Sequence, residues 1–284
     1  MTFSLPEGLP SGRSVPAGSP VMWYADRLPY DPLLDVWARA QRQQDATGLR
    51  PILCYADDDH PRSLDLAEIA AVDLEAELEQ GWREYRERQL AWLAAPPEPM
   101  DCPEDIEPWE DDPGAPYDRW PGLAPATLPA SGVDPDEAAR AAFARLLREG
   151  WPGISLGLVA AAARSADIPA VIGWRAEAPL PLFCALLRSW EDRFGARVLA
   201  AIGATLYVSV ACPPRTQEQA DLVALEHLLT TADNIVNDTL PPVRGLPHRR
   251  PGVELLVGLN GRPRAAPGGY PVAWRLHRPL ACRA

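Results

Sequence analysis

Four side chains in the last quarter of the chain have types suited to acid–base chemistry. Glu226 and His227 are adjacent, and Asp233 and Asn234 follow shortly after them. In one interpretation His227 is a general base that Asp233 orients, while Arg193 holds an anionic substrate. In the other, Glu226 and His227 lie at the exposed end of a helix and Asp233 caps the turn that follows. We favour the second and keep the first as the alternative.

The common signatures of nucleotide, serine-hydrolase and zinc chemistry are missing from the sequence. It contains no Gly-rich phosphate loop, no Gly-x-Ser-x-Gly and no His-Glu-x-x-His. The cysteines are never spaced as a zinc or redox pair, which favours buried free thiols. They are Cys54, Cys102, Cys184, Cys212 and Cys282. We therefore predict no cofactor and no metal site.

The charge of the chain is unevenly distributed. Of the net charge of −12, residues 241–284, with eight Arg and one Glu, carry +7, so the first 240 residues carry −19. A body this acidic repels phosphate backbones, and we expect no nucleic-acid partner. The sequence has no long apolar run and no basic start followed by an apolar segment, so we also expect no membrane association and a cytoplasmic location.

The first half of the chain divides by composition. Residues 1–20 form a Pro/Gly/Ser-rich, flexible lead-in, and residues 21–94 an N-terminal α/β segment. Within that segment the patterns predict strands at 21–24 and 51–55 and a helix opening at Asp31. Helical spacing of apolar residues continues over 64–93, with Gly81 as a candidate break. Residues 95–133 are acidic and Pro-rich, which predicts a linker or surface loop.

Residues 134–242 have the pattern of an α+β domain. A helix is predicted to begin at Asp134-Pro135, and another to end at Gly195. The region between and after them predicts a strand at 154–160, two strands within 197–211 joined at Gly203-Ala204, and a helix from Thr216. We expect a mixed or antiparallel sheet packed against helices.

Three segments of this domain carry a resemblance to a known family. Residues 187–197 (LRSWEDRFGAR), 213–216 (PPRT) and 233–235 (DNI) resemble the C-terminal block of domain of unknown function 4253. Weaker similarity covers 21–55 and 120–125. The family has no known activity, and this chain departs from its pattern: Thr231-Ala232 replaces Cys-Pro, and Ala204 and Tyr207 replace an Asp and a His. If the family has a catalytic set built on those groups, this chain has lost part of it.

The same resemblance implies an aromatic C-terminal ending that this chain lacks. Family members end in Trp-x-Phe-Trp-Trp-Asp, whereas residues 243–284 are rich in Arg, Pro and Gly. Residues 253–260 can be encoded as GTG GAG CTT CTG GTG GGA CTG AAC, which one nucleotide later reads TGG AGC TTC TGG TGG GAC TGA. The shifted frame spells Trp-Ser-Phe-Trp-Trp-Asp and a stop. Our hypothesis is that residues 243–284 are an out-of-frame, disordered tail; the alternative is a genuine basic arm.

Together these observations predict a non-catalytic module that binds another protein. The alternative is an enzyme of unknown class that uses Glu226, His227, Asp233 and Asn234 with Arg193.

Overall fold

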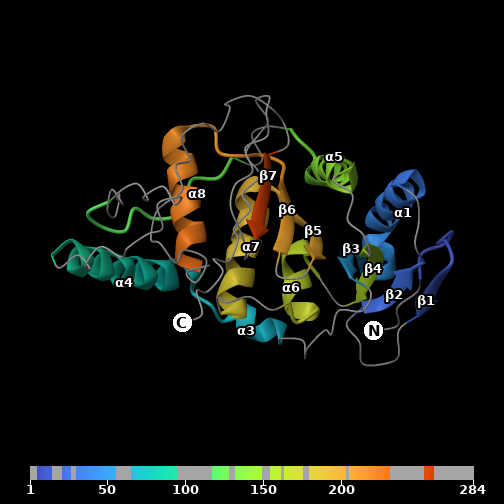
Figure 1. Ribbon diagram of the computed structural model, residues 1–284, viewed down its shortest axis with the longest axis horizontal. Coiled ribbons are helices and arrows are strands. Elements are labelled where there is room, and N and C mark those ends of the chain that lie inside the picture. The colour runs from blue at the N-terminus through green and yellow to red at the C-terminus, as the bar shows by residue number, and fades with distance from the viewer. Residues whose placement is uncertain are drawn as a thin grey trace, which may run out of the picture.

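The computed structural model describes eleven stretches of the chain. They are residues 5–14, 21–26, 30–55, 65–94, 117–127, 132–148, 154–160, 163–174, 179–202, 205–230 and 253–258. Within them the strands form a seven-stranded sheet in the order β1-β2-β4-β3-β5-β6-β7. The helices pack on both faces of this sheet (Figure 1), so the fold is α+β as the sequence predicts.

The sheet is mixed. Its strands are β1 (Gly12–Ser14), β2 (Val21–Ala25), β3 (Leu49–Tyr55), β4 (Ile154–Ala160), β5 (Ala196–Ile202), β6 (Thr205–Val210) and β7 (Val253–Gly258). Every neighbouring pair runs antiparallel except β3 and β5, which run parallel. Strands from the first half of the chain therefore lie beside strands from the second half, and β3 separates β4 from β5.

The helices begin and end largely where the sequence predicts. They are α1 (Tyr30–Arg42), α2 (Gln44–Thr47), α3 (Leu66–Ala70), α4 (Leu74–Ala94), α5 (Pro135–Arg148), the 3-10 turn η1 (Ser165–Asp167), α6 (Ile168–Val171), α7 (Leu180–Phe194) and α8 (Gln217–Thr230). Asp134 caps α5 by accepting the Asp136 N–H at 2.9 Å. Gly195 ends α7 with a φ of 65°, a left-handed conformation that glycine adopts without strain.

One predicted helix differs from the structure in the position of its break. The break falls between α3 and α4, at residues 71–73, and Gly81 lies inside α4. Asp73 explains the restart of the helix, because its carboxylate accepts the Ala76 N–H at 3.2 Å. A Cβ atom at position 81 would lie against Leu229 of α8.

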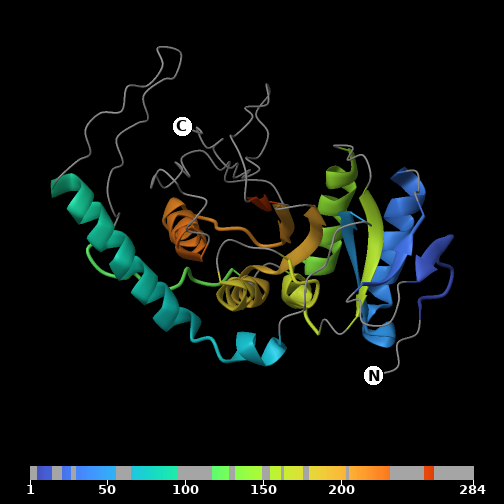
Figure 2. The same ribbon diagram turned by 60° about the horizontal axis from the view of Figure 1, so that its bottom comes forward.

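Two apolar clusters cover the two faces of the sheet. On one face α6 and α7 pack against Ile52 and Leu206, and on the other α1 and α5 pack against Leu53 and Leu199. Side chains along β3 alternate between the clusters, as a strand buried on both faces requires. Helix α4 forms an outer layer: Trp82 and Tyr85 pack against Leu225 and Leu228 of α8. Figure 2 shows α4 lying outside α7 and α8.

Part of the predicted acidic linker packs onto the domain. Ala124 and Thr127 are buried, and the Thr127 N–H donates to the Arg193 carbonyl at 3.0 Å. The Thr127 hydroxyl donates to the carbonyl of Cys212. Residues 95–116 and 128–131 lie outside the described residues, as do residues 1–4 and 15–20 of the predicted lead-in.

Within the tail predicted for residues 243–284, the structure describes residues 253–258. Val253–Gly258 form β7, which pairs antiparallel with β6 from Thr205↔Gly258 to Val210↔Val253. Without β7, β6 would present a row of unpaired backbone groups, and the Val- and Leu-rich run at 253–257 suits a strand. The rest of 243–284 lies outside the described residues.

Among the helices of the described ranges, none is long and apolar enough to cross a membrane.

Candidate functional site

Two of the predicted site residues, Arg193 and Glu226, lie in contact. Arg193, near the end of α7, donates from Nη1 to Glu226 Oε1 at 2.9 Å and from Nη2 to Oε2 at 2.7 Å. The Trp190 indole donates to Oε2 and the Ala124 backbone N–H donates to Oε1, both at 2.7 Å. Glu226 is fully buried, at 0% exposure. Its carboxylate therefore joins α7, α8 and the 117–127 segment.

This geometry corrects the prediction that Glu226 lies at the exposed end of a helix. The carboxylate is in the core because four donors compensate for its desolvation. Arg193 also donates to the Ala124 carbonyl at 2.7 Å, so the guanidinium predicted to hold a substrate is engaged inside the protein.

His227 faces the same layer of the core. Its ring centroid lies 6.1 Å from that of Trp190, and although the side chain is only partly buried, Nε2 is fully enclosed. Burial lowers the pKa of His227 to about 4, since an enclosed imidazole is costly to protonate. At neutral pH the ring is uncharged. Asp233 and Asn234 lie outside the described residues.

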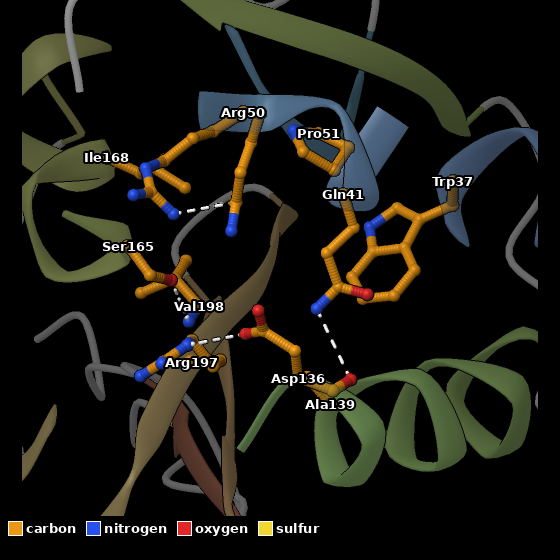
Figure 3. Close-up of a pocket in the computed structure, with 11 residues that line it drawn as sticks. Trp37, Gln41, Arg50, Pro51, Asp136, Ala139, Ser165, Ile168, Arg197 and Val198 are labelled. Carbon is orange, nitrogen blue, oxygen red and sulfur yellow. Dashed lines mark hydrogen bonds and ion pairs between the residues drawn. The ribbon is translucent and has the colours of Figure 1, made fainter. Parts of the chain in front are cut away.

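A polar pocket lies elsewhere, where sequence reasoning placed no site. It opens between the starts of the parallel strands β3 and β5, whose ladder comprises Leu53↔Ala200 and Cys54↔Ala201. Arg50 lies three residues before Leu53, and Arg197 lies three residues before Ala200. Both arginines line the wall of the pocket. The cavity has a volume of about 20 Å³, which is room for about one water molecule. Figure 3 shows side chains from α1, α5, η1 and both strands around it.

The charged groups of the pocket are held by hydrogen bonds. Arg197 Nε donates to Asp136 Oδ1 at 2.9 Å, and Gln41 Nε2 donates to the Asp136 carbonyl at 3.3 Å. Arg50 donates to Gln44 Oε1 at 2.8 Å and to the Ala163 carbonyl at 2.7 Å. Burial lowers the pKa of the Arg50 guanidinium from its ordinary value. These contacts fix the polar groups around the space.

Trp37 closes the apolar side of the pocket. It is 2% exposed, and its ring stacks on Phe143 of α5 with centroids 4.3 Å apart. The indole Nε1 is buried and has no hydrogen-bond partner among the described residues. A buried donor without an acceptor costs free energy, and the small polar cavity beside it has room for a water that could accept this hydrogen bond.

Metal and thiol chemistry find no support in the described ranges. There, no group of three or more His, Cys, Asp or Glu side chains could hold a metal ion. Cys54, Cys184 and Cys212 are buried thiols, as the sequence predicts, and burial raises the pKa of Cys184 to about 12. Cys102 and Cys282 lie outside the described residues.

The comparison with protein families bears on this region. Residues 155–249 match the model described as Domain of unknown function (DUF4253). The match includes all three segments on which the sequence resemblance rests, whereas the weaker similarity at 21–55 and 120–125 falls outside it. Neither the curated proteins nor the solved structures gave a match to the chain.

The DUF4253 match covers the Arg193–Glu226 pair but only some of the residues that line the pocket. Arg193 and Glu226 both fall within it. The pocket draws Ser165 and Arg197 from within the matched range but Trp37, Arg50 and Asp136 from outside it. The residues that line the pocket are far apart in the sequence and share no motif, so only the folded sheet brings them together. The sequence signals near it were local: Asp136 follows the predicted cap at Asp134, and Arg50 directly precedes the strand predicted at 51–55.

Proposed function

We propose that this chain is a cytoplasmic, non-catalytic module that binds another protein. The observation that carries the proposal is the set of hydrogen bonds that the Glu226 carboxylate accepts. Its carboxylate is saturated by four donors and has no exposure to solvent, so it serves packing rather than proton transfer. Arg193 is committed to the same ion pair.

The state of His227 supports the same proposal. A general base works best when its pKa lies near the working pH, and burial lowers the pKa of His227 to about 4. Its Nε2 is enclosed, out of reach of a substrate in solvent.

Surface charge indicates the kind of partner. The first 240 residues carry −19. On α4, Trp82 and Tyr85 pack against α8, and the exposed side chains include Glu84 and Glu87 beside Arg83 and Arg88. The net negative charge of the first 240 residues suits a partner protein with a basic face and disfavours nucleic acid.

The test is capture of a partner by the full chain, followed by reconstitution. The tagged protein is purified from cells that carry its gene, and a captured protein is identified, purified and titrated by calorimetry at two salt concentrations. We expect binding that weakens with salt and drops several-fold for Glu87→Arg, since rim charges act mainly through electrostatics. Glu137→Arg, the same charge reversal on α5, is the control.

The alternative, an enzyme, makes the opposite prediction. His227→Gln should leave partner binding unchanged under our proposal. A substrate screen in which the wild-type chain turns over a compound, and folded His227→Gln or Asp233→Ala does not, would replace our proposal with the alternative.

A further inference from the structure

We propose that helix α4 is a movable cover, and that the partner protein binds the apolar face of α8 that α4 occupies. The inference rests on the proposed function, because it assigns the surface that the partner uses. This α8 face consists of Leu225, Leu228 and Leu229. It packs against Trp82 and Tyr85 of α4, and Figure 2 shows α4 as the outer layer there. The partner that fits has an amphipathic helix that takes the place of α4.

The apolar cluster under α4 is small and distinct from the clusters on the two sheet faces. Its buried members are Trp82 and Tyr85 of α4 with Leu225 and Leu228 of α8. On its other side α8 contributes Leu222 to the cluster that it shares with α7, and a buried ion pair also joins it to α7. Helix α8 therefore stays attached to the domain when α4 leaves it.

Two indole groups under the cover favour its movement. The Nε1 atoms of Trp82 and Trp120 are buried and have no hydrogen-bond partner among the described residues. Both side chains belong to the cluster under α4. A buried donor without an acceptor costs free energy, whereas an exposed indole N–H donates to water. Opening relieves this cost, which lowers the free energy needed to move α4.

The hydrogen bonds of Arg86 hold α4 to the segment beside it. Arg86 donates to the Tyr117 carbonyl at 2.9 Å and pairs with Asp118 at 3.5 Å. Arg83 pairs with Glu79 within α4 itself, at 2.7 Å. These contacts tie the cover to its neighbouring segment, so the two can move together.

The chain is anchored at both ends of the moving part. Ile69 of α3 is buried against α7, and Leu74 in the first turn of α4 packs on the cluster with α7. At the other end the Ala124 N–H is held by Glu226 at 2.7 Å. Gly122 lies just before it with a φ of 86°, where an added Cβ would meet nothing within 4 Å among the described residues. A glycine in the left-handed region with open space around it suits a hinge.

The charges beside the α8 face indicate the chemistry of the partner helix. Asp221 precedes Leu225 by four residues and so lies on the same side of α8. Burial raises the pKa of Tyr117, and the nearby carboxylates of Asp221 and Glu218 raise it further. Acidic groups therefore lie next to the apolar face. A helix with an apolar stripe and a basic side chain beside it complements this surface.

Thiol labelling measures the opening without the partner. Leu225 is 0% exposed under α4, so the thiol of Leu225→Cys reacts only when the cover moves. Cys184, a native thiol of α7 that is also 0% exposed, is the reference within the same molecule. Global unfolding exposes both thiols together, whereas movement of α4 exposes only the first. We expect maleimide to modify position 225 about tenfold faster than Cys184 under native conditions.

A loosened cover should bind the partner more tightly. Arg86→Ala removes the hydrogen bond to the Tyr117 carbonyl, so labelling at position 225 should accelerate several-fold. The affinity for the purified partner should rise by the same factor, because the binding-competent state is more populated. Arg83→Ala is the matched control on the same helix and should change neither quantity. A partner that needed α4 in place would instead bind Arg86→Ala more weakly.

A disulfide can lock the cover in place. A Cβ at position 81 would lie 3.8 Å from the Cβ of Leu229, the separation found in disulfides. The oxidised double variant, Gly81→Cys with Leu229→Cys, should bind the purified partner about tenfold more weakly than the same chain after reduction. Gly81→Cys alone, taken through the same oxidation and reduction, is the control and should show no such difference.

Three results would overturn the proposal. Equal labelling rates at position 225 and at Cys184 would show that α4 leaves only on global unfolding. Equal affinity of the oxidised and reduced double variant would show that the partner binds another surface, and the proposed function would stand. Faster labelling at position 225 with no protein captured would overturn the proposed function, and with it the binding role of the α8 face.

Discussion

Arg193 and Glu226 form a two-hydrogen-bond ion pair that joins α7 to α8, with N–O distances of 2.9 and 2.7 Å. The side chains are 13% and 0% exposed. Removing one partner of such a pair leaves the other buried and uncompensated, which is among the costliest single changes a fold can suffer. Trp190 and Ala124 donate to the same carboxylate, so three elements depend on it.

Glu226→Gln should therefore destabilise the protein by about 3–5 kcal/mol, because the amide keeps the shape but turns a donor toward donors. Urea denaturation measures the change in the free energy of unfolding. Glu137→Gln is the control: its partner Arg140 is 50% exposed and the pair lies at i,i+3 on α5. Surface pairs of this kind contribute about 0–1 kcal/mol. Equal losses in the two variants would refute a supporting role for Glu226.

His227 should make stability depend on pH below neutrality. Burial lowers its pKa to about 4 in the folded chain, against an ordinary value of 6.5. The unfolded chain therefore binds the proton first, so the stabilisation is complete above pH 6.5 and is lost as the pH falls toward 4. Between pH 7 and 5 the loss should be at most about 2 kcal/mol.

The measurement compares urea midpoints of the wild-type chain and His227→Gln at pH 7, 6 and 5, a window in which most carboxylates stay ionised. The stability of the variant should change less over this window. Parallel pH profiles for both proteins would show that His227 is not the group responsible.

The elements that the sequence predicts well are those with local signals. Asp134 followed by Pro135 fixes the start of α5, and Gly195 fixes the end of α7, because capping acts within one turn. The burial of Glu226 could not be predicted in this way. Its partners Arg193 and Ala124 lie 33 and 102 residues away in the chain. No pattern within α8 reports them.

The pocket was invisible in the sequence for a related reason. Arg50 and Arg197 become neighbours only because β3 and β5 are adjacent, parallel strands. A prediction of a mixed or antiparallel sheet does not specify which strands pair. The Trp37 indole could be recognised as an unpaired donor only once Phe143 was placed against it.

Gly81 provides a test of the helix that the sequence divided wrongly. It lies inside α4, and an added Cβ would meet Leu229 at 3.8 Å, which is ordinary contact. Gly81→Ala should therefore stabilise the protein by about 0.5–1 kcal/mol, the difference in helix propensity. Gly195→Ala is the opposite control, because φ is 65° there and a side chain is strained. If Gly81→Ala destabilises, the α4–α8 contact is tighter than the structure indicates.

The reading frame of the C-terminus is the last prediction. We propose that resequencing the codons for residues 239–260 will reveal one base wrongly inserted or left out, so that the chain ends in Trp-Ser-Phe-Trp-Trp-Asp. Read one nucleotide later, the codons of β7 (Val253–Gly258) encode this aromatic segment. In the given frame, β7 is the strand that pairs with β6. Along a strand its first, third and fifth residues, Trp, Phe and Trp, would share one face.

A corrected chain should unfold at a higher urea concentration than the chain of 284 residues, since aromatic side chains bury more apolar area than Val and Leu. The control is the corrected chain with its three Trp codons changed to Ser, which keeps the length and loses the gain. If the frame stands as given, and residues 243–284 resist protease in the purified protein, the out-of-frame hypothesis is wrong. The basic segment, with its charge of +7, would then be a genuine arm that opposes the −19 of the body.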